Sequence, residues 1–193
     1  MINGAGGNQN EALPNIAEFD ERELLNDGSV KGFFNLNMKV FQDVIEVNTM
    51  GTVIPCFVFG RGMAGQKRGA IINFASMTSY RPISKVAAYC IAKGGIVNFP
   101  QWLASYLAPA GVRVNAIAPG FFLNDRSRKI MFNEDGSQTE RAINVLGHTP
   151  MNRFGEAAEL IGCMNWLIDE QAAGFVTGIT IPIDGGFLSR PGI

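Results

Sequence analysis

Two apolar runs separated by one long segment constrain the fold of this chain more than any other feature. Residues 71–74 and 112–118 are rich in Ile, Val and Ala, which is typical of buried strands. The segment between them is predicted to form a helix over residues 86–107. A strand, a crossover helix and a second strand form a βαβ unit, whose two strands lie parallel in one sheet. The sequence therefore predicts an α/β fold whose ligands bind at the carboxyl ends of the strands.

Three polar side chains are expected at that end of the sheet. Ser76 follows the first strand, and Tyr89 and Lys93 project from one helix face because they are four residues apart. An ammonium one turn from a phenol favours the phenolate, so Lys93 is expected to lower the pKa of Tyr89. The Ser76 hydroxyl can hold a carbonyl oxygen while Tyr89 supplies a proton. This chemistry suits reversible carbonyl reduction, in which a nicotinamide supplies the hydride because no side chain can.

A Tyr-x-x-x-Lys pair alone is a weak signal, since a surface Lys beside a half-buried Tyr looks the same. The wider pattern resembles the short-chain dehydrogenase/reductase family, whose signature places a Ser 13 residues before the Tyr, as here (89 − 76 = 13). That family also has an Asn on the preceding helix, an Asn-Ala-Gly-like loop upstream and a Pro-Gly loop after the next strand. Asn48, residues 3–6 and residues 115–120 stand at those places in the same order.

The resemblance implies a Rossmann-like doubly wound parallel sheet, NAD or NADP as cofactor, and a role for each matching residue. Tyr89 would be the acid/base, Ser76 would orient the carbonyl, Lys93 would also hold the nicotinamide ribose, and Asn48 would complete a proton relay. For Asn48 the alternative is a polar core residue bonded to backbone. The cofactor-binding residues implied are Asn3, Ala5, Gly6, Tyr89, Lys93, Pro119, Gly120 and Phe122.

The chain resembles only about the last two-thirds of a typical family member. In a doubly wound dinucleotide fold, the first βαβαβ half carries the glycine-rich pyrophosphate turn. Residues 1–7 instead look like the end of the fourth strand and the loop after it, and they do not fit G-x-G-x-x-G. We therefore expect one partial domain over residues 1–193, lacking most of the first half and edged by the strand at residues 69–75. Expressed alone, it is expected to self-associate and to show no saturable NAD(P)H binding.

Two irregular segments are expected around this core. Residues 8–36 are polar and poorly periodic, which predicts a surface loop, either a mobile flap or an insertion. Residues 121–154 occupy the place of the family's substrate-binding loop and are rich in Arg. A guanidinium suits bidentate binding of a carboxylate, and Arg153 is the first candidate for substrate binding. The alternative for each of these arginines is a solvated surface charge.

Short blocks indicate a subgroup of the family. INGAGGN, APGFF, TPMNRFG and VTGITIPIDGGF resemble the D-mannonate oxidoreductase (fructuronate reductase) type. This resemblance implies a small-molecule carbonyl or alcohol substrate, a sugar acid such as fructuronate or mannonate, and a homo-oligomer, dimer or tetramer. Two alternatives remain: a catalytically inert fragment that retains only the oligomerisation and substrate-loop half, and an extended-family sugar-nucleotide epimerase.

Composition argues against several other classes of protein. The hydrophobic fraction is 47%, the charged fraction 17% and the net charge −1, which suggests neither a nucleic-acid-binding nor a membrane-surface protein. The three cysteines are scattered and there is one histidine, so no metal site is predicted. Neither a signal peptide nor a membrane span is recognised, and a cytoplasmic location is expected.

Overall fold

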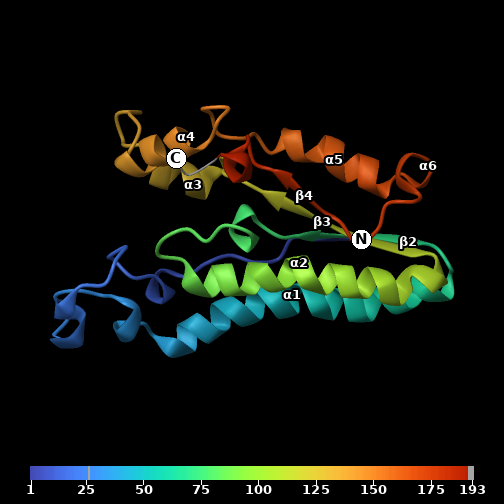
Figure 1. Ribbon diagram of the computed structural model, residues 1–193, viewed down its shortest axis with the longest axis horizontal. Coiled ribbons are helices and arrows are strands. Elements are labelled where there is room, and N and C mark those ends of the chain that lie inside the picture. The colour runs from blue at the N-terminus through green and yellow to red at the C-terminus, as the bar shows by residue number, and fades with distance from the viewer. Residues whose placement is uncertain (26, 191–193) are drawn as a thin grey trace.

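A four-stranded parallel sheet forms the centre of the molecule. The computed structural model describes residues 1–25 and 27–190, and its strands follow one another in the order β1-β2-β3-β4 (Figure 1). The strands are β1 (Ile2–Asn3), β2 (Gly69–Phe74), β3 (Val112–Pro119) and β4 (Thr180–Ile183). All three pairings are parallel. The predicted Rossmann-like α/β fold is confirmed.

Helices cover both faces of the sheet. The long helices α1 (Met38–Gly65) and α2 (Ala87–Leu107) lie side by side on one face, and α5 (Ala158–Ile168) with the short α6 (Glu170–Ala173) lies on the other (Figure 1). Two further helices, α3 (Asp125–Met131) and α4 (Glu140–His148), follow β3. No helix among the described residues combines the length and apolarity needed to cross a bilayer.

The alternation of side chains along β2 explains how one strand holds two layers together. Ile71 packs with Leu103 of α2 on one face, whereas its neighbour Ile72 packs with Leu167 of α5 on the other. Successive residues of a strand point to opposite faces, so adjacent apolar residues serve both layers. Ile71 and Ile72 are almost fully buried, and each contributes about 1.5–3 kcal/mol through burial.

The edge of the sheet differs from the prediction. The sequence suggested that residues 69–75 would form the edge, but β1 pairs with β2, with Ile2 opposite Ile72. Met1 extends the pairing, because its amino group donates to the Ala70 carbonyl at 2.7 Å and its own carbonyl accepts from the Ile72 amide at 2.9 Å. A short strand thus covers the middle of β2.

Residues 8–36 are mostly irregular, whereas residues 121–154 contain α3 and α4. Residues 8–36 contain, in their described part, three short 3-10 helices, at Asn10–Ala12, Glu21–Leu25 and Phe33–Asn35. The Lys85 ammonium donates to the Asn15 carbonyl at 2.7 Å, and the Arg126 guanidinium donates to the Asn8 carbonyl at 3.1 Å. This segment is therefore tied both to the loop before α2 and to α3.

Gly120 provides a test of the packing after β3. A Cβ atom at this position would lie 2.7 Å from the Cα atom of Asp184, a backbone atom that cannot move aside cheaply. We expect Gly120→Ala to lower the free energy of unfolding by about 1–3 kcal/mol. Gly162→Ala is the matched control, because a Cβ there meets nothing within 4 Å. In mid-helix this change should stabilise by about 0.5–1 kcal/mol. Urea unfolding measures both, and a Gly120→Ala variant as stable as wild type would contradict the close approach.

Candidate active site

Helix α2 places Tyr89 and Lys93 on one face at the carboxyl end of β2. The Lys93 side chain is buried, and its Nζ atom donates to the Phe74 carbonyl at 2.7 Å. The same Nζ atom lies 5.6 Å from the centroid of the Tyr89 ring. The four-residue spacing thus brings an ammonium beside a phenol, as predicted.

The turn after β2 brings Ser76 to the same place. Ser76 caps the short 3-10 helix η4 (Met77–Ser79), and its Oγ atom accepts from the Thr78 amide at 3.2 Å. Ser76 is also close enough to the Tyr89 phenol to oppose the rise of its pKa. The Ser79 hydroxyl donates to the Lys93 carbonyl at 2.6 Å. The turn is therefore joined to α2 through Ser79, and the structure brings Ser76, Tyr89 and Lys93 together.

Burial controls the protonation of the pair. It raises the pKa of Tyr89 above its ordinary value, against the smaller opposing effect of Ser76. Burial also lowers the pKa of Lys93 to about 8. The pKa of Tyr89 therefore moves opposite to the direction expected from Lys93, because removing the phenolate from water has the largest effect on it. Near neutral pH, Tyr89 carries its proton and Lys93 is charged.

A pocket of about 290 Å³ opens beside this pair. Six of the predicted cofactor-binding residues line it: Gly6, Tyr89, Lys93, Pro119, Gly120 and Phe122. Six further residues complete the lining: Gly4, Gly7, Phe74, Ala75, Asn124 and Leu160. Phe74 and Ala75 directly precede Ser76, so their place at the strand end could have been read from the sequence. Leu160 belongs to α5, and no local pattern indicates that it reaches the pocket.

Asn3 and Ala5 do not line this pocket but support the loop that does. The Asn3 amide donates to the Asn73 Oδ1 atom at 2.8 Å and to the Cys56 sulfur at 3.2 Å, which joins β1 to β2 and α1. Ala5 lies against α1, where a Cβ atom at Gly51 would be 3.2 Å from its own. A direct contact of Asn3 or Ala5 with a cofactor stays a prediction.

Asn48 holds the glycine loop through its side-chain amide. Its Nδ2 atom donates to the carbonyls of Gly7 and Val44, both at 2.7 Å, and its Oδ1 atom accepts from the Gly7 amide at 3.1 Å. The loop fits closely, because a Cβ atom at Gly6 would clash with this Oδ1 atom. Asn48 is fully buried, as expected for a core residue bonded to backbone. Its part in a proton relay stays a prediction.

Arg153 already has a partner elsewhere. Its guanidinium donates to both carboxylate oxygens of Glu159, at 2.8 and 2.6 Å, and this pair lowers the pKa of Glu159 to about 2. Arg153 lines a separate pocket that shares Phe122 with the one beside Tyr89. Binding of a substrate carboxylate by Arg153 stays a prediction, and it would compete with Glu159.

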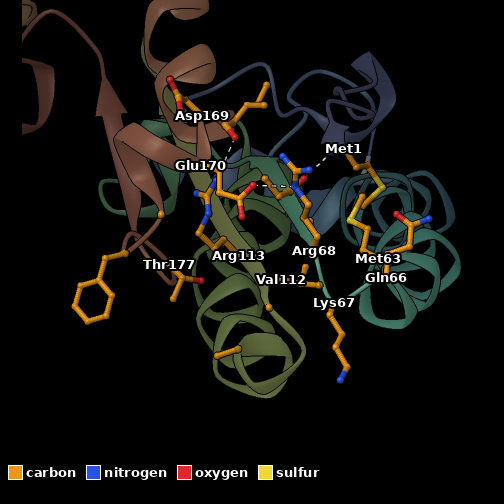
Figure 2. A pocket seen from close by; sticks show the side chains of 17 residues that line it. Met1, Met63, Gln66, Lys67, Arg68, Val112, Arg113, Asp169, Glu170 and Thr177 are labelled. Carbon is orange, nitrogen blue, oxygen red and sulfur yellow. Dashed lines mark hydrogen bonds and ion pairs between the residues drawn. The ribbon is translucent and has the colours of Figure 1, made fainter.

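A larger cavity of about 990 Å³ lies at the opposite, amino end of the strands (Figure 2). Arg68 there forms an ion pair with Glu170 at 2.8 Å, and the Arg113 guanidinium donates to the Leu167 carbonyl, also at 2.8 Å. These side chains hold the start of β2 and β3 to the α5–α6 region. Ligands of open parallel sheets bind at the carboxyl ends, so the smaller pocket beside Tyr89 is the candidate active site.

The residues of the smaller pocket fit the nicotinamide end of a dinucleotide. A cavity of about 290 Å³ lies at the lower limit for small-molecule sites and suits part of a dinucleotide. The Lys93 ammonium can donate to ribose hydroxyls, and the glycines of residues 4–7 leave room for close approach of a ring. Among the described residues, no cluster of three or more His, Cys, Asp or Glu side chains is placed to hold a metal ion.

Comparison with known proteins decides the family. The family profile described as Enoyl-(Acyl carrier protein) reductase matches residues 24–188. An uncharacterized oxidoreductase of Bacillus subtilis (strain 168), UxuB, is 42% identical over 193 residues, which are all of this chain and 68% of that protein. The chain belongs to the short-chain dehydrogenase/reductase family. Members of this family are NAD(P)-dependent oxidoreductases, and the chain is an enzyme of that class.

Solved structures of the family agree with this fold. A Haemophilus influenzae protein, provisionally assigned as a D-mannonate oxidoreductase and crystallised with bound NAD, matches with a TM-score of 0.91 and 40% identity. The match covers 100% of this chain and 68% of that one. An Agrobacterium tumefaciens protein, provisionally a 2-deoxy-D-gluconate 3-dehydrogenase with bound NADP, matches with a TM-score of 0.77 and 25% identity, over 98% and 67% of the two chains. Short-chain dehydrogenases/reductases thus use either dinucleotide.

The lowered pKa of Lys93 predicts a specific pH dependence of stability. Between its folded pKa of about 8 and the unfolded value near 10.4, the unfolded chain binds more protons than the folded chain. The Lys93 contribution to the free energy of unfolding therefore rises with pH across this window. Lys93→Met removes that contribution. The free energy of unfolding of the wild type, relative to that of the variant, should therefore rise by about 1–3 kcal/mol between about pH 8 and about pH 10.

Urea unfolding at several pH values measures this gain. Lys129→Met is the matched control, because Lys129 is an exposed lysine of α3. The free energy of unfolding of this variant should follow that of the wild type at every pH. A Lys93→Met curve parallel to the wild-type curve would show that Lys93 is not buried as described.

Proposed function

We propose that this chain catalyses the reversible NAD(P)-dependent reduction of a carbonyl group on a sugar acid, of the fructuronate/mannonate kind. The observation that carries the proposal is the partly buried Tyr89 phenol, whose pKa is influenced by Ser76 and whose ring centroid lies 5.6 Å from the Lys93 ammonium at the carboxyl end of the sheet. These are the groups that reduction of a carbonyl needs, in one place.

Each residue has a distinct part in the proposed reaction. The nicotinamide supplies the hydride when it is bound. Ser76 donates a hydrogen bond to the substrate carbonyl oxygen and fixes its position. Tyr89 gives that oxygen its proton, which the raised pKa keeps on the phenol at neutral pH. The Lys93 ammonium stabilises negative charge that develops on the phenol oxygen as the proton leaves.

The protonation state of Tyr89 determines how reduction and oxidation depend on pH. A site that rests with its phenol protonated is ready to reduce a carbonyl, whereas oxidation of an alcohol needs the phenolate as base. Because burial raises the pKa of Tyr89, oxidation should require a higher pH than reduction.

A sugar-acid substrate is supported by similarity rather than by a contact in the pocket. The Haemophilus influenzae relative carries a D-mannonate oxidoreductase assignment, and the Escherichia coli 2-dehydro-3-deoxy-D-gluconate 5-dehydrogenase is 28% identical over 180 residues. The latter match covers 91% of this chain and 69% of that protein. Both names refer to sugar acids with a carboxylate, so we propose the same chemical class here.

We further propose a cytoplasmic enzyme that works as a homo-oligomer. All three cysteines are free, which supports a reducing compartment. Large apolar side chains are exposed on the two long helices, including Phe57 at 82% on α1 and Tyr106 at 68% on α2. Apolar surface of this kind favours association with other copies.

Tyr89→Phe tests the proposed acid directly. In a protein that also carries the glycine-rich pyrophosphate turn, the change removes the phenolic proton and keeps the ring, so turnover of a sugar-acid substrate should fall by at least about 100-fold. NADH affinity, measured by isothermal titration, should stay within a few-fold. Tyr106→Phe is the matched control on the same helix, since its side chain is exposed, and it should leave turnover unchanged.

The two measurements together separate the alternatives. Normal turnover by Tyr89→Phe would exclude Tyr89 as the acid. Absence of saturable NADH and NADPH binding by the wild-type chain would instead favour the catalytically inert fragment.

A further inference from the structure

A cleft of about 460 Å³ lies between the loop that precedes α2 and helix α4. Four basic side chains line it: Arg81 and Lys85 from the loop, and Arg141 and His148 from α4. The carboxylate of Glu140 is the acidic group among its lining residues. Three Lys and Arg side chains thus face one carboxylate, and the cleft carries a net positive charge even with His148 neutral.

The positive charge of the cleft is not neutralised within the described part of the chain. The Arg81 guanidinium donates to the Arg190 carbonyl at 3.1 Å, and the Lys85 ammonium donates to the Asn15 carbonyl at 2.7 Å. Arg141 is exposed, and no hydrogen bond or ion pair of its side chain occurs among the described residues. Carbonyls orient cations but do not cancel their charge, so this cleft differs from the Arg153–Glu159 pair.

The cleft and the candidate active site are lined by neighbouring stretches of the chain. The loop that carries Arg81 and Lys85 runs from the turn begun by Ser76 to the helix that carries Tyr89. On the other side, Phe121 lines the cleft and the next residue, Phe122, lines the pocket beside Tyr89. Neighbouring residues of one loop therefore line the cleft and the pocket.

We propose that this cleft binds the carboxylate of the sugar-acid substrate, with Arg141 and Lys85 as its main ligands. The assignment rests on the proposed function, which places a carbonyl of an acidic sugar at Tyr89. Arg141 has its guanidinium free for a bidentate contact, and Lys85 adds a fixed cation on the opposite wall. Phe121, stacked edge-to-face on Phe187 with ring centroids 5.7 Å apart, supplies an apolar wall between carboxylate and carbonyl.

The single histidine of the chain makes the cleft directly observable. His148 lines the cleft, and its Nδ1 atom lies 2.8 Å from the Asn144 carbonyl, which fixes the ring. Because the chain has one histidine, NMR of ¹⁵N-histidine-labelled protein gives one imidazole spectrum. We expect D-mannonate, added with NAD present, to shift these signals saturably. D-Mannitol, in which a hydroxymethyl group replaces the carboxylate, should shift them little.

Arginine variants distinguish binding in the cleft from binding at arginines elsewhere. Arg141→Ala should weaken D-mannonate binding, and raise its KM, by roughly 10- to 150-fold, the range for loss of a charged hydrogen-bonded contact. Arg128→Ala, which removes an exposed arginine of α3 outside the cleft, should have no effect. Arg153→Ala should weaken D-mannonate binding less than Arg141→Ala does. Urea unfolding of each variant confirms that the fold persists.

Each result supports or overturns the assignment. Equal shifts with D-mannitol, or inorganic phosphate binding as tightly as D-mannonate, would overturn it, as would an effect of Arg153→Ala larger than that of Arg141→Ala. Tyr89→Phe separates the two proposals, because it should abolish turnover while D-mannonate still shifts the His148 signals. If Arg141→Ala turned over D-mannonate with the KM of the wild type, the carboxylate would not bind in the cleft. The proposed function would then still stand.

Discussion

The hydrogen bond from the Lys93 ammonium to the Phe74 carbonyl is the contact on which the candidate site depends. A buried ammonium without a partner is costly, and this bond supplies one at the last residue of β2. This bond therefore fixes the position of α2 along the direction of the strands. It thereby also positions Tyr89, which lies one helical turn before Lys93. The same burial that makes the bond necessary lowers the pKa of Lys93 and raises that of Tyr89.

Several residues expected to touch ligand hold the ligand-facing backbone in place. Asn48 fixes Gly7 through both ends of its amide, and Asn3 ties β1 to β2 and α1. Ser79 joins the turn after Ser76 to α2 at the Lys93 carbonyl. Half of the pocket lining is Gly, Ala or Pro, and buried amides and hydroxyls hold the backbone of this lining in place.

The sequence was sufficient where periodicity determines structure. Apolar runs predicted β2 and β3, and the four-residue spacing predicted that Tyr89 and Lys93 share a face. The sequence was insufficient where a pKa depends on burial, or where a side chain's partner is distant in the chain. The pKa of Tyr89 moves opposite to expectation because desolvation has the largest effect on it. Arg153 pairs with Glu159 at the start of α5, and the basic cleft joins residues about 60 positions apart, which no local pattern reveals.

The most direct test of this account is the titration of Tyr89 itself. The chain has three tyrosines, so ¹³Cζ-labelled tyrosine gives three NMR signals, and the one missing from Tyr89→Phe identifies Tyr89. The account predicts that this phenol titrates above the ordinary tyrosine pKa of about 10, because it is buried beside Ser76 and Lys93. Titration at or below about 10 would contradict the account, since it would mean that the Lys93 charge, and not burial, controls the proton.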